Sequence, residues 1–400
     1  MADLADKRIV LGLTGGIACY KIAELLRRMI EQGAQVDVVM TEAATHFITP
    51  VTLQALSGRT VYVDAWDARV ANNMPHIDLT RGADLVLIAP ASADFMAKMA
   101  HGMADDLLST LCLACPCPMA VVPAMNREMW EKPATQRNVA QLRADGVAIF
   151  GPASGDQACG ETGDGRMLEP ADILADVVAE LAEKSLQGVR ILLTAGPTSE
   201  PVDPVRVLTN RSSGKTGYAL ARAAVEAGAT VTLVTGPTAL PLPRGATVVP
   251  AHTARQMHSA VMQHAGDADI FIGVAAVADW HVTNVSAHKH KKDAGGDAPA
   301  LAFAPNPDIL AEVAALADGP WCVGFAAETE KLAEHAEAKR RRKGVPLLVG
   351  NLAQNVMDAD STELVLFDEA GAHPLPAATK RDAALRLIGE IATRYRARRR

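Results

Sequence analysis

Three residues in the first half of the chain have side chains suited to polar catalysis. His76 carries an imidazole, which titrates near neutrality and can serve as a base or an electrostatic partner. Asn126 offers an amide that can hold a carboxylate, although it also suits the N-cap of a helix beginning at Arg127. Cys159 stands among glycines, as expected of a flap that closes over a substrate, and a thiol is a reasonable acid near neutral pH. A structural histidine, a helix cap and a small buried thiol are the alternative interpretations.

Two segments that place small residues between a strand and a helix suit phosphate binding. Unpaired backbone N–H groups and the helix dipole favour an anion at such a position. Gly12–Ile17 lacks the G-x-G-x-x-G spacing of dinucleotide-binding loops, and Ser213–Thr216 has Thr209 where a P-loop has its first glycine. The sequence therefore indicates phosphate binding in both halves without a standard fingerprint. Tight strand–helix packing is the alternative for the Gly-Gly turn.

The elements that must position these residues follow a strand–helix–strand pattern. Apolar periodicity predicts a strand over Arg8–Gly16, a helix from Ile17 that stops at Gly33 and a strand over Ala34–Met40. Further strands are expected at Leu85–Ala89 and Met119–Val122, each leading into a loop that contains proline. Parallel sheets bind ligands at the carboxyl ends of their strands, so these loops are the expected sites.

The pattern begins again in the second half. Val189–Gly196 predicts a strand, Gly214–Ala227 a helix and Thr230–Thr235 the next strand. The turn at Gly228 repeats the turn at Gly33 further along the chain (228 − 33 = 195), which is about half its length. Each half is therefore expected to form its own doubly wound α/β domain.

Composition excludes several classes of protein. Hydrophobic residues make up 49% and charged residues 21% of the 400 residues, so the chain is expected to fold throughout. A formal net charge of −7 gives no footprint for nucleic acid. No apolar run reaches the ~18 residues of a membrane helix, and the N-terminus lacks a secretory pattern. A soluble cytoplasmic protein with reduced cysteines is the expectation.

Three further segments call for an interpretation. Cys112, Cys115 and Cys117 lie in an apolar segment away from other metal ligands, which favours core thiols over a metal site. The polar, glycine-rich segment 288–297 indicates a mobile loop. The arginines of segment 394–400 indicate a solvated helix end.

Motifs in both halves resemble known enzymes. Those of the first half are similar to the homo-oligomeric flavin-containing cysteine decarboxylases, and those of the second half to phosphopantothenate-cysteine ligase. The resemblance spans nearly the whole chain in the right order, so the sequence is identified as a member of the bacterial bifunctional coenzyme A biosynthesis proteins. The motifs that carry it are Gly15-Gly-Ile-Ala-Cys-Tyr-Lys21, His76-Ile-Asp78, Ala89-Pro-Ala-Ser-Ala-Asp94, Pro123-Ala-Met-Asn126, 158–167, 195–206, 209–215, Ala275-Ala-Val-Ala-Asp279 and Val323-Gly-Phe-Ala-Ala-Glu328.

The resemblance implies an architecture and a set of partners. It implies an α/β fold of two doubly wound Rossmann-like domains. Residues 1–188 would form a flavodoxin-like, FMN-dependent phosphopantothenoylcysteine decarboxylase, and 189–400 a phosphopantothenate-cysteine ligase. The implied substrates are phosphopantothenate, cysteine and CTP, with no nucleic acid or membrane partner. The implied assembly is a homo-oligomer in which decarboxylase trimers are joined by ligase-domain dimers into a dodecamer.

The implied chemistry of the first half is a decarboxylation in which the carbanion left by loss of CO₂ must be stabilised. A simple amino-acid carboxylate loses CO₂ readily only beside an electron sink, and oxidation of the substrate thiol to a thioaldehyde by FMN would create one. The resemblance makes His76 the active-site histidine, Asn126 the holder of the substrate carboxylate and Cys159 the proton donor of the final reduction. The expected flavin contacts are Gly15, Gly16, Ile17, Thr41, Ser92, Ala93 and Asp94.

The first half departs from the family pattern at two positions. Met74-Pro75 stands where the family generally has glycine before the histidine, which bears on the path of that loop. Asp105 stands where relatives tend to have asparagine, which bears on any flavin contact that needs an amide.

The implied chemistry of the second half is activation of a carboxylate as an acyl-nucleotide, which cysteine then attacks. CTP is the implied nucleotide, with ATP open as an alternative. Mg²⁺, whose ligands the sequence does not identify, and lysines would stabilise charge at the α-phosphate. Asn210 matches the residue that holds the acyl group, and Lys289 the mobile-loop lysine, with Lys291 and Lys292 as alternatives. The expected nucleotide contacts are Ser212, Gly214, Gly273, Ala275, Asp279, Lys289, Asn306, Pro307, Asp308, Ile309, Phe325, Lys339 and Lys343.

Two other functions compete with the bifunctional enzyme. One is a flavin-binding scaffold that keeps the fold without turnover, which the presence of His76, Asn126 and Cys159 disfavours. The other is an unrelated Rossmann oxidoreductase, which the missing G-x-G-x-x-G disfavours.

Overall fold

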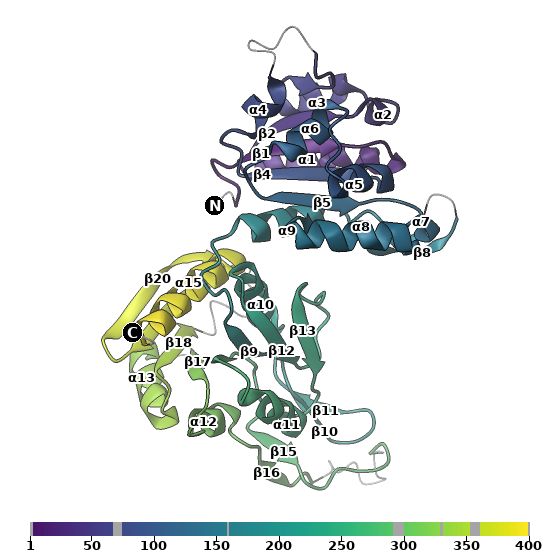
Figure 1. Cartoon of the computed structure of the whole chain (residues 1–400). Coiled ribbons are helices and arrows are strands. Elements are labelled where there is room, and N and C mark those ends of the chain that lie inside the picture. The colour runs from purple at the N-terminus through teal and green to yellow at the C-terminus, as the bar shows by residue number, and fades with distance from the viewer. Residues whose placement is uncertain are drawn as a thin grey trace. The chain divides into compact units, whose positions relative to one another are not determined.

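The chain forms two compact units, Met1–Leu181 and Ala182–Arg400, in the computed structural model (Figure 1). The structure describes residues 3–66, 74–157, 160–290, 300–328, 331–352 and 361–398. Leu186 packs in the core of the second unit, which explains why the polar segment that follows Leu181 belongs to that unit.

The first unit is built on a parallel sheet with the strand order β3-β2-β1-β4-β5-β6. The strand order reverses between β1 and β4, so the loops after these two strands define a switch point, where such sheets bind ligands. Without the short edge strand β3, the order is that of flavodoxin, as expected. The strands are β1 Arg8–Leu13, β2 Gln35–Met40, β3 Val61–Tyr62, β4 Leu85–Ala91, β5 Met119–Pro123 and β6 Ala148–Ile149.

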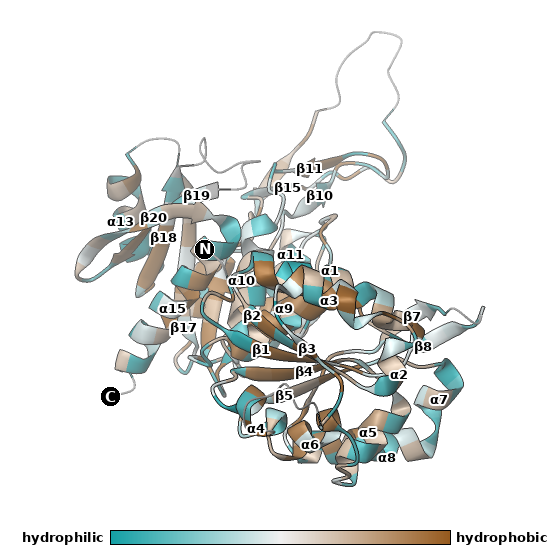
Figure 2. Cartoon of the chain, turned by 90° about the horizontal axis from the view of Figure 1, so that it is seen from above, coloured by the Kyte–Doolittle hydropathy of each residue, from teal (hydrophilic) through white to brown (hydrophobic). Residues whose placement is uncertain are grey.

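Helices cover both faces of this sheet because its strands are apolar on both sides. In β1, Ile9 and Leu11 pack with the helices α1 and α9, whereas Val10 packs with α5 and α6 on the other face. The strands are accordingly mostly apolar along their length (Figure 2). The helices are η1 Ile17–Lys21, α1 Ile22–Glu31, α2 Glu42–Thr45, α3 Pro50–Ser57, α4 Pro75–Thr80, α5 Ala93–Ala100, α6 Leu107–Leu113, α7 Arg127–Glu131, α8 Pro133–Ala144 and α9 Pro170–Leu181.

The glycine-rich segment of the first unit forms an antiparallel ribbon. Strands β7 (Ala153–Asp156) and β8 (Thr162–Arg166) pair with each other outside the main sheet. Cys159, the expected proton donor, lies between them but outside the described residues.

The second unit repeats the architecture and extends it. Its sheet has the order β13-β12-β9-β14-β17-β18-β19-β20, parallel as far as β18 and antiparallel beyond it. The switch point lies between β9 and β14. The strands of this sheet are β9 Arg190–Ala195, β12 Thr230–Thr235, β13 Ala246–Pro250, β14 Ile270–Gly273, β17 Trp321–Glu328, β18 Leu347–Leu352, β19 Ser361–Asp368 and β20 Gly371–Thr379.

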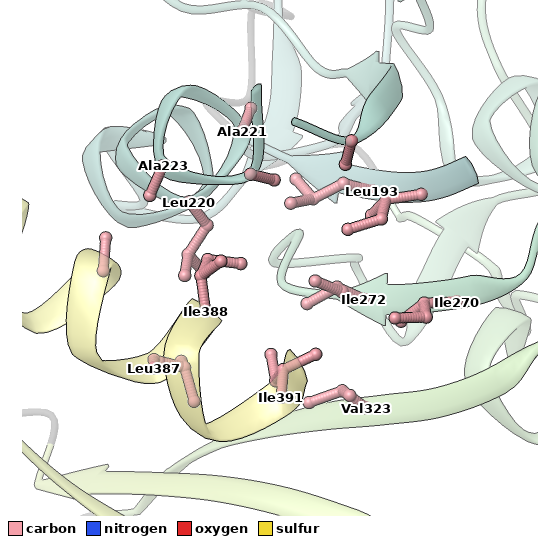
Figure 3. Close-up of a cluster of buried hydrophobic side chains, with 14 of the residues drawn as sticks. Leu193, Leu220, Ala221, Ala223, Ile270, Ile272, Val323, Leu387, Ile388 and Ile391 are labelled. Carbon is pink, nitrogen blue, oxygen red and sulfur yellow. The ribbon is translucent and has the colours of Figure 1, made fainter. Parts of the chain in front are cut away.

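Helices also sandwich the second sheet. Leu387, Ile388 and Ile391 of the C-terminal helix face Leu220 of α10 and the buried strand residue Val323 (Figure 3). The helices α11, α12 and α13 pack against the other face. The helices are α10 Lys215–Glu226, α11 Ala254–Ala265, α12 Ile309–Ala314, α13 Leu332–Lys343 and α15 Lys380–Arg398, and the ribbons are β10 Ser199–Pro201 with β11 Val207–Thr209 and β15 Trp280–Val282 with β16 Phe303–Pro305.

The repeated turn predicted from the sequence is present. Gly33 precedes β2 and Gly228 precedes β12, and both glycines have left-handed backbone angles, φ 89° and 88°. The doubly wound α/β class is therefore confirmed for both halves. One element differs in detail: the helix expected from Ile17 begins as a 3₁₀ turn and becomes α-helical only at Ile22. Across the described ranges, no helix is long and apolar enough to cross a membrane.

Candidate functional site

A cavity of about 630 Å³ lies at the carboxyl ends of the first unit's strands. Its lining brings together residues that follow β1, β4 and β5 with residues of the β7–β8 ribbon. The predicted residues that line it are Gly15, Gly16, Ile17, Ser92, Ala93 and Asn126.

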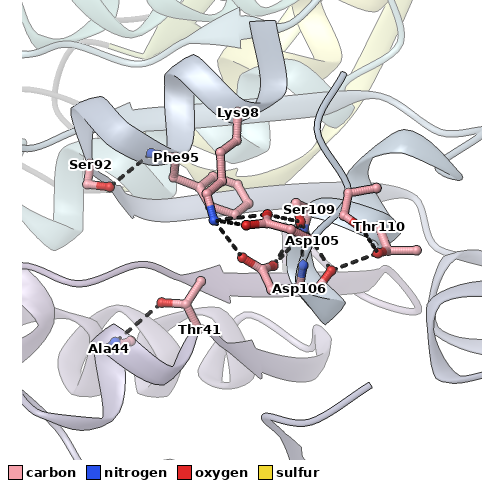
Figure 4. A network of polar contacts seen from close by, with 10 residues as sticks. Thr41, Ala44, Ser92, Phe95, Lys98, Asp105, Asp106, Ser109 and Thr110 are labelled. Atoms are coloured by element: carbon pink, nitrogen blue, oxygen red, sulfur yellow. Dashed lines mark hydrogen bonds and ion pairs between the residues drawn. The ribbon is translucent and has the colours of Figure 1, made fainter. Parts of the chain in front are cut away.

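Local hydrogen bonds explain how the switch-point loops are held. The Thr14 hydroxyl donates to the Pro90 carbonyl at 2.7 Å and accepts from the Ser92 N–H at 2.9 Å, which ties the loop after β1 to the loop after β4. Ser92 then caps α5 by accepting from the Phe95 N–H at 3.2 Å (Figure 4). A Cβ at Gly15 would come within 2.7 Å of Ala43 Cβ, so glycine is needed for this close approach.

The cavity lining fits a flavin. Side chains such as Tyr20, Met125 and Met129 offer apolar surface for a planar ring system. The beginning of α5 at Ser92–Ala93 presents backbone N–H groups and the positive end of the helix dipole, which suit a phosphate.

Two of the predicted flavin contacts, Thr41 and Asp94, are not part of this cavity's described lining. Thr41 caps α2 by accepting from the Ala44 N–H at 3.3 Å (Figure 4), and Asp94 lies in the first turn of α5. Neither is among the described residues that line the cavity, so their contacts with flavin stay predictions.

Asn126 uses both ends of its amide. Its Oδ1 accepts from the Glu128 N–H at 2.8 Å and caps α7, while its Nδ2 donates to Glu161 Oε2 at 2.5 Å. The helix-cap alternative and the ligand-binding interpretation are therefore compatible. The cap fixes the carbonyl end and leaves the N–H end to bind an acceptor.

The β7–β8 ribbon is held against the Asn126 loop. The Arg127 N–H donates to Gln157 Oε1 at 3.0 Å, and Gln157 Nε2 donates to the Asp164 carbonyl at 3.1 Å. A Cβ at Gly165 would lie 2.6 Å from the Met125 carbonyl oxygen, so only glycine permits this approach. The segment expected to act as a flap thus borders the cavity.

His76 lies apart from this group of residues. It sits half-buried on α4 and is not among the described residues that line the cavity. Pro75 occupies the first turn of α4, where proline is favoured because its missing N–H has no helical partner. The segment 67–73 that leads into α4 lies outside the described residues.

Asp105 is engaged by a lysine. Lys98 Nζ contacts an Asp105 carboxylate oxygen at 2.9 Å and Asp106 at 3.4 Å, and Asp106 caps α6 through the Ser109 N–H (Figure 4). The hydrogen bond from Lys98 lowers the pKa of the Asp105 carboxyl. This carboxylate has no N–H to offer a flavin, so an asparagine-like donor contact is lost at this position.

The three clustered cysteines show no metal site. Cys112 is buried, and burial raises the pKa of its thiol, as expected of a core cysteine. The Sγ atoms of Cys115 and Cys117 are 3.3 Å apart, and a hydrogen bond from Cys117 lowers the pKa of the Cys115 thiol. Within the part of the chain that the structure describes, no group of three or more Cys, His, Asp or Glu could hold a metal ion.

The second unit has a pair of adjoining cavities at its switch point. Their volumes are about 350 and 240 Å³, and Ala275, Val277, Phe325 and Lys339 line both. The first cavity also has Ser212 and Gly214 in its lining. The second is also lined by Gly273, Asp279, Asn306, Pro307, Asp308, Ile309 and Lys343. The structure thus gathers the predicted nucleotide contacts, apart from Lys289, into one region.

The start of α10 explains the need for glycine in the first of these cavities. Gly214 is the N-cap of α10 with φ 77°, and a Cβ there would meet Thr238 Cγ2 at 2.8 Å. The backbone can therefore turn directly from Ser212 into a helix whose N–H groups face the cavity.

Asn210 connects the loops of the second switch point. Its Nδ2 donates to the Ala276 carbonyl at 2.5 Å, and its Oδ1 accepts from the Ser212 N–H at 3.0 Å. It joins the loop after β14 to the phosphate-type loop before α10, at the edge of the first cavity.

Lys339 and Lys343 extend from one face of α13 into the second cavity, as their spacing predicts. Lys339 Nζ donates to the Phe325 carbonyl at 3.0 Å, and Lys343 forms an ion pair with Asp308. Burial lowers the pKa of both lysines, and the Asp279 carboxylate opposes that shift. These two cations are the natural partners for anionic groups of a ligand.

Asn306 presents an acceptor in the same cavity. Its Nδ2 donates to the Ala278 carbonyl at 2.9 Å, whereas its buried Oδ1 has no hydrogen-bond partner among the described residues. A buried acceptor of this kind is stabilised by a ligand that brings an N–H.

Lys289 is exposed and lies outside the described linings of both cavities. The segment that bears it is anchored next to it: the His290 N–H donates to Asp203 Oδ2 at 3.2 Å, and Arg206 Nη1 contacts Asp203 at 2.6 Å and the His290 carbonyl at 3.2 Å. Burial alone would raise the pKa of Asp203, but these N–H donors and those of Val205 and Arg206 hold it at about 2. Lys291 and Lys292 lie outside the described residues.

Sequence reasoning missed some of the residues that line the first of these cavities. Asn351 lies in β18, and the rule that ligands bind at the carboxyl ends of parallel strands could have identified it. Lys380 begins the C-terminal helix far along the chain, and no motif brings it to this site.

These folds and cavities define a flavoprotein of two α/β units. The family model described as Flavoprotein matches residues 2–182, and the model described as DNA/pantothenate metabolism flavoprotein C-terminal domain matches residues 186–395.

Sequence identity to full-length relatives identifies the family within this class. The chain is 48% identical to the coenzyme A biosynthesis bifunctional protein CoaBC of Vibrio cholerae, over 98% of this chain and 100% of that protein. It is also 48% identical to the protein of the same name from Escherichia coli, over 98% of each chain. A crystal structure of the C-terminal domain of such a protein is 37% identical, covering 54% of this chain and 100% of that one, with a TM-score of 0.47. The chain therefore belongs to the family of bifunctional coenzyme A biosynthesis proteins. The resemblance inferred from the motifs is confirmed, and the chain is an enzyme of that pathway.

Proposed function

We propose that the second unit joins phosphopantothenate to cysteine through an acyl-cytidylate made from CTP, and that the first unit decarboxylates the product to phosphopantetheine with FMN. The observation that carries the proposal is the placement of the predicted residues. Most of those for the flavin, together with Asn126, border one switch point, and those for the nucleotide, except Lys289, border the other. Each unit thus has a cavity suited to its own step.

In the first unit, bound FMN would supply reversible oxidation of the substrate thiol, which creates the electron sink for loss of CO₂. Asn126 Nδ2 would orient the substrate carboxylate, and the cap on its Oδ1 keeps the donor in place. Cys159 would donate the final proton and His76 would assist thiol oxidation.

The proposed role of His76 depends on how the subunits assemble. His76 is not among the described residues that line the cavity, and the resemblance implies flavin sites between subunits of a trimer. A site completed by a neighbouring subunit would bring His76 and Asn126 together. Exposed apolar residues of the first unit, including Ile17 (62% exposed) and Tyr20 (66% exposed), are consistent with such an interface.

In the second unit, Lys339 and Lys343 would bind the nucleotide phosphates, assisted by Mg²⁺ supplied with the nucleotide. Asn306 Oδ1 would accept from the amino group of the base. Asn210 would hold the acyl group, and Lys289 would act on the activated intermediate from the segment anchored by Asp203.

The ligase half is also proposed to dimerise. Its two ribbons carry exposed apolar side chains, among them Val205 and Val207 near β11, Trp280 of β15 and Phe303 of β16. Trimers of the first unit joined through these dimers would give the proposed dodecamer, which we place in the cytoplasm. Size-exclusion chromatography with light scattering tests the size of the assembly.

Product analysis tests the proposed function. The purified protein is incubated with phosphopantothenate, cysteine, Mg²⁺ and either CTP or ATP, and the products are identified by mass spectrometry. Phosphopantetheine is expected with CTP. Equal yield with ATP would overturn the nucleotide assignment. Formation of neither phosphopantothenoylcysteine nor phosphopantetheine would favour the flavin-binding scaffold.

A further inference from the structure

A carboxylate of the chain itself is bound to the amide that would hold the substrate carboxylate. Asn126 Nδ2 donates to Glu161 Oε2 at 2.5 Å. Since Oδ1 of the same amide caps α7, the N–H end cannot exchange places with the carbonyl end without loss of the cap. The amide therefore presents a donor to Glu161 and to any acceptor that replaces it.

Glu161 reaches this position from the ribbon that borders the cavity. It directly precedes β8, and its carbonyl accepts from the Gln157 N–H at 2.8 Å, which pairs the two sides of the ribbon. Its side chain is half-buried. The pairing with Gln157 uses the backbone of Glu161 and not its carboxylate, so a change of side-chain rotamer leaves this pair of the ribbon intact.

We propose that Glu161 is a specificity-determining residue that occupies the substrate-carboxylate position on Asn126 and is displaced when substrate binds. This rests on the proposed decarboxylase function. Asn126 Nδ2 carries two N–H donors, but two carboxylates bound to the same nitrogen would repel each other, so the substrate must replace Glu161 to be held there. After CO₂ leaves, Glu161 returns and satisfies the amide, which a product without a carboxylate cannot do.

Two ligands, one with the carboxylate and one without it, are expected to respond differently to changes at Glu161. The seryl analogue of phosphopantothenoylcysteine keeps the carboxylate but has no thiol to oxidise, and the corresponding ethanolamine amide lacks the carboxylate. Only the first must displace Glu161. Binding of each to the full-length, flavin-loaded protein is measured by calorimetry and by the change in flavin absorbance.

Glu161→Gln is expected to lower the Kd of the seryl analogue about 10-fold, because a neutral acceptor competes less well than a charged one. The Kd of the ethanolamine amide should change less than about twofold. Glu128→Gln is the matched control, since Glu128 is an exposed carboxylate whose side chain pairs with Arg127. It should change neither Kd.

Glu161→Asp separates occupancy from charge. It keeps the negative charge but shortens the side chain, so it should tighten binding of the seryl analogue as Glu161→Gln does. It also provides the test if Glu161→Gln fails to retain flavin. A Kd for the seryl analogue that is unchanged or higher in either variant would overturn the proposal. Wild-type protein that binds neither ligand would instead refute the decarboxylase function itself.

Discussion

The hydrogen bonds and ion pairs that orient single side chains determine what those side chains can do at these sites. Asn126 presents a donor because a helix cap fixes its other end. Lys339 is held by the Phe325 carbonyl, and Asp203 by backbone N–H groups and Arg206. In each case, the hydrogen bonds that the fold provides hold a polar group in a defined orientation.

Asp203 should couple the stability of the second unit to pH. Its folded pKa of about 2 lies below the ordinary value of about 3.9, so its stabilising effect is present above pH ~4 and is lost as pH falls towards 2. Wild type should exceed Asp203→Asn in unfolding free energy by a constant amount from about pH 5 to 8, and the difference should shrink below about pH 4. Denaturant titration at several pH values measures this. Asp318→Asn, at an exposed carboxylate, is the control, and a difference that grows below pH 4 would contradict the assignment.

Lys339 should determine nucleotide affinity. Lys339→Gln removes a cation from the second cavity, and the KM for CTP is expected to rise about 10-fold or more, the effect of losing one charge-assisted contact. Arg341→Gln is the matched control on the same helix, because that side chain is 75% exposed. Steady-state kinetics of phosphopantothenoylcysteine formation measures both. An unchanged KM in Lys339→Gln would remove this lysine from the nucleotide site.

Secondary-structure elements bring these residues together through a repeated strand–helix–strand unit. Periodicity located β1, β2, β9 and β12 because buried parallel strands are rich in Val, Leu and Ile. It did not reveal the antiparallel pair β19–β20 beyond β18. None of the residues of β20 is fully buried, so this strand leaves only a weak apolar pattern in the sequence.

The start of α10 makes a prediction about backbone conformation. Gly214→Ala combines a left-handed backbone angle, which costs about 1–2 kcal/mol, with a clash against Thr238. Gly188→Ala has the same φ of 77° but nothing within 4 Å of the added Cβ. Both variants should lower stability, and only Gly214→Ala should also raise the KM for CTP. Thermal unfolding and kinetics compare them, and equal kinetic effects would argue against a role for this turn.

The residues predicted for the nucleotide, except Lys289, line the cavities of the second unit, whereas those predicted for the first unit lie only partly at its cavity. Many of the nucleotide residues lie near the carboxyl ends of parallel strands of one chain, which the fold class brings together, while Lys339 and Lys343 lie on α13. The position of His76 relative to Asn126 could not be predicted in this way, because no residue of α4 is among the described residues that line the cavity. A sequence carries no pattern for how subunits place such a residue. Glu161 was missed because a glutamate in a glycine-rich ribbon resembles solvated charge.

At the scale of the whole molecule, the chain joins two related α/β units that carry different chemistry. Their sheets share a switch-point geometry, while the loops at the strand ends differ. The proposed ligase supplies the substrate of the proposed decarboxylase. A defect confined to the first unit should therefore stop the sequence of reactions at a definite compound.

Product analysis of Asn126→Asp tests this account most directly. Aspartate keeps the N-cap of α7, but it replaces the amide donor with a second negative charge, so the substrate carboxylate should be repelled. With phosphopantothenate, cysteine, Mg²⁺ and CTP, mass spectrometry should show phosphopantothenoylcysteine accumulating at the wild-type rate of ligation, and phosphopantetheine forming at least about 100-fold more slowly. Phosphopantetheine formed at the wild-type rate would contradict the account.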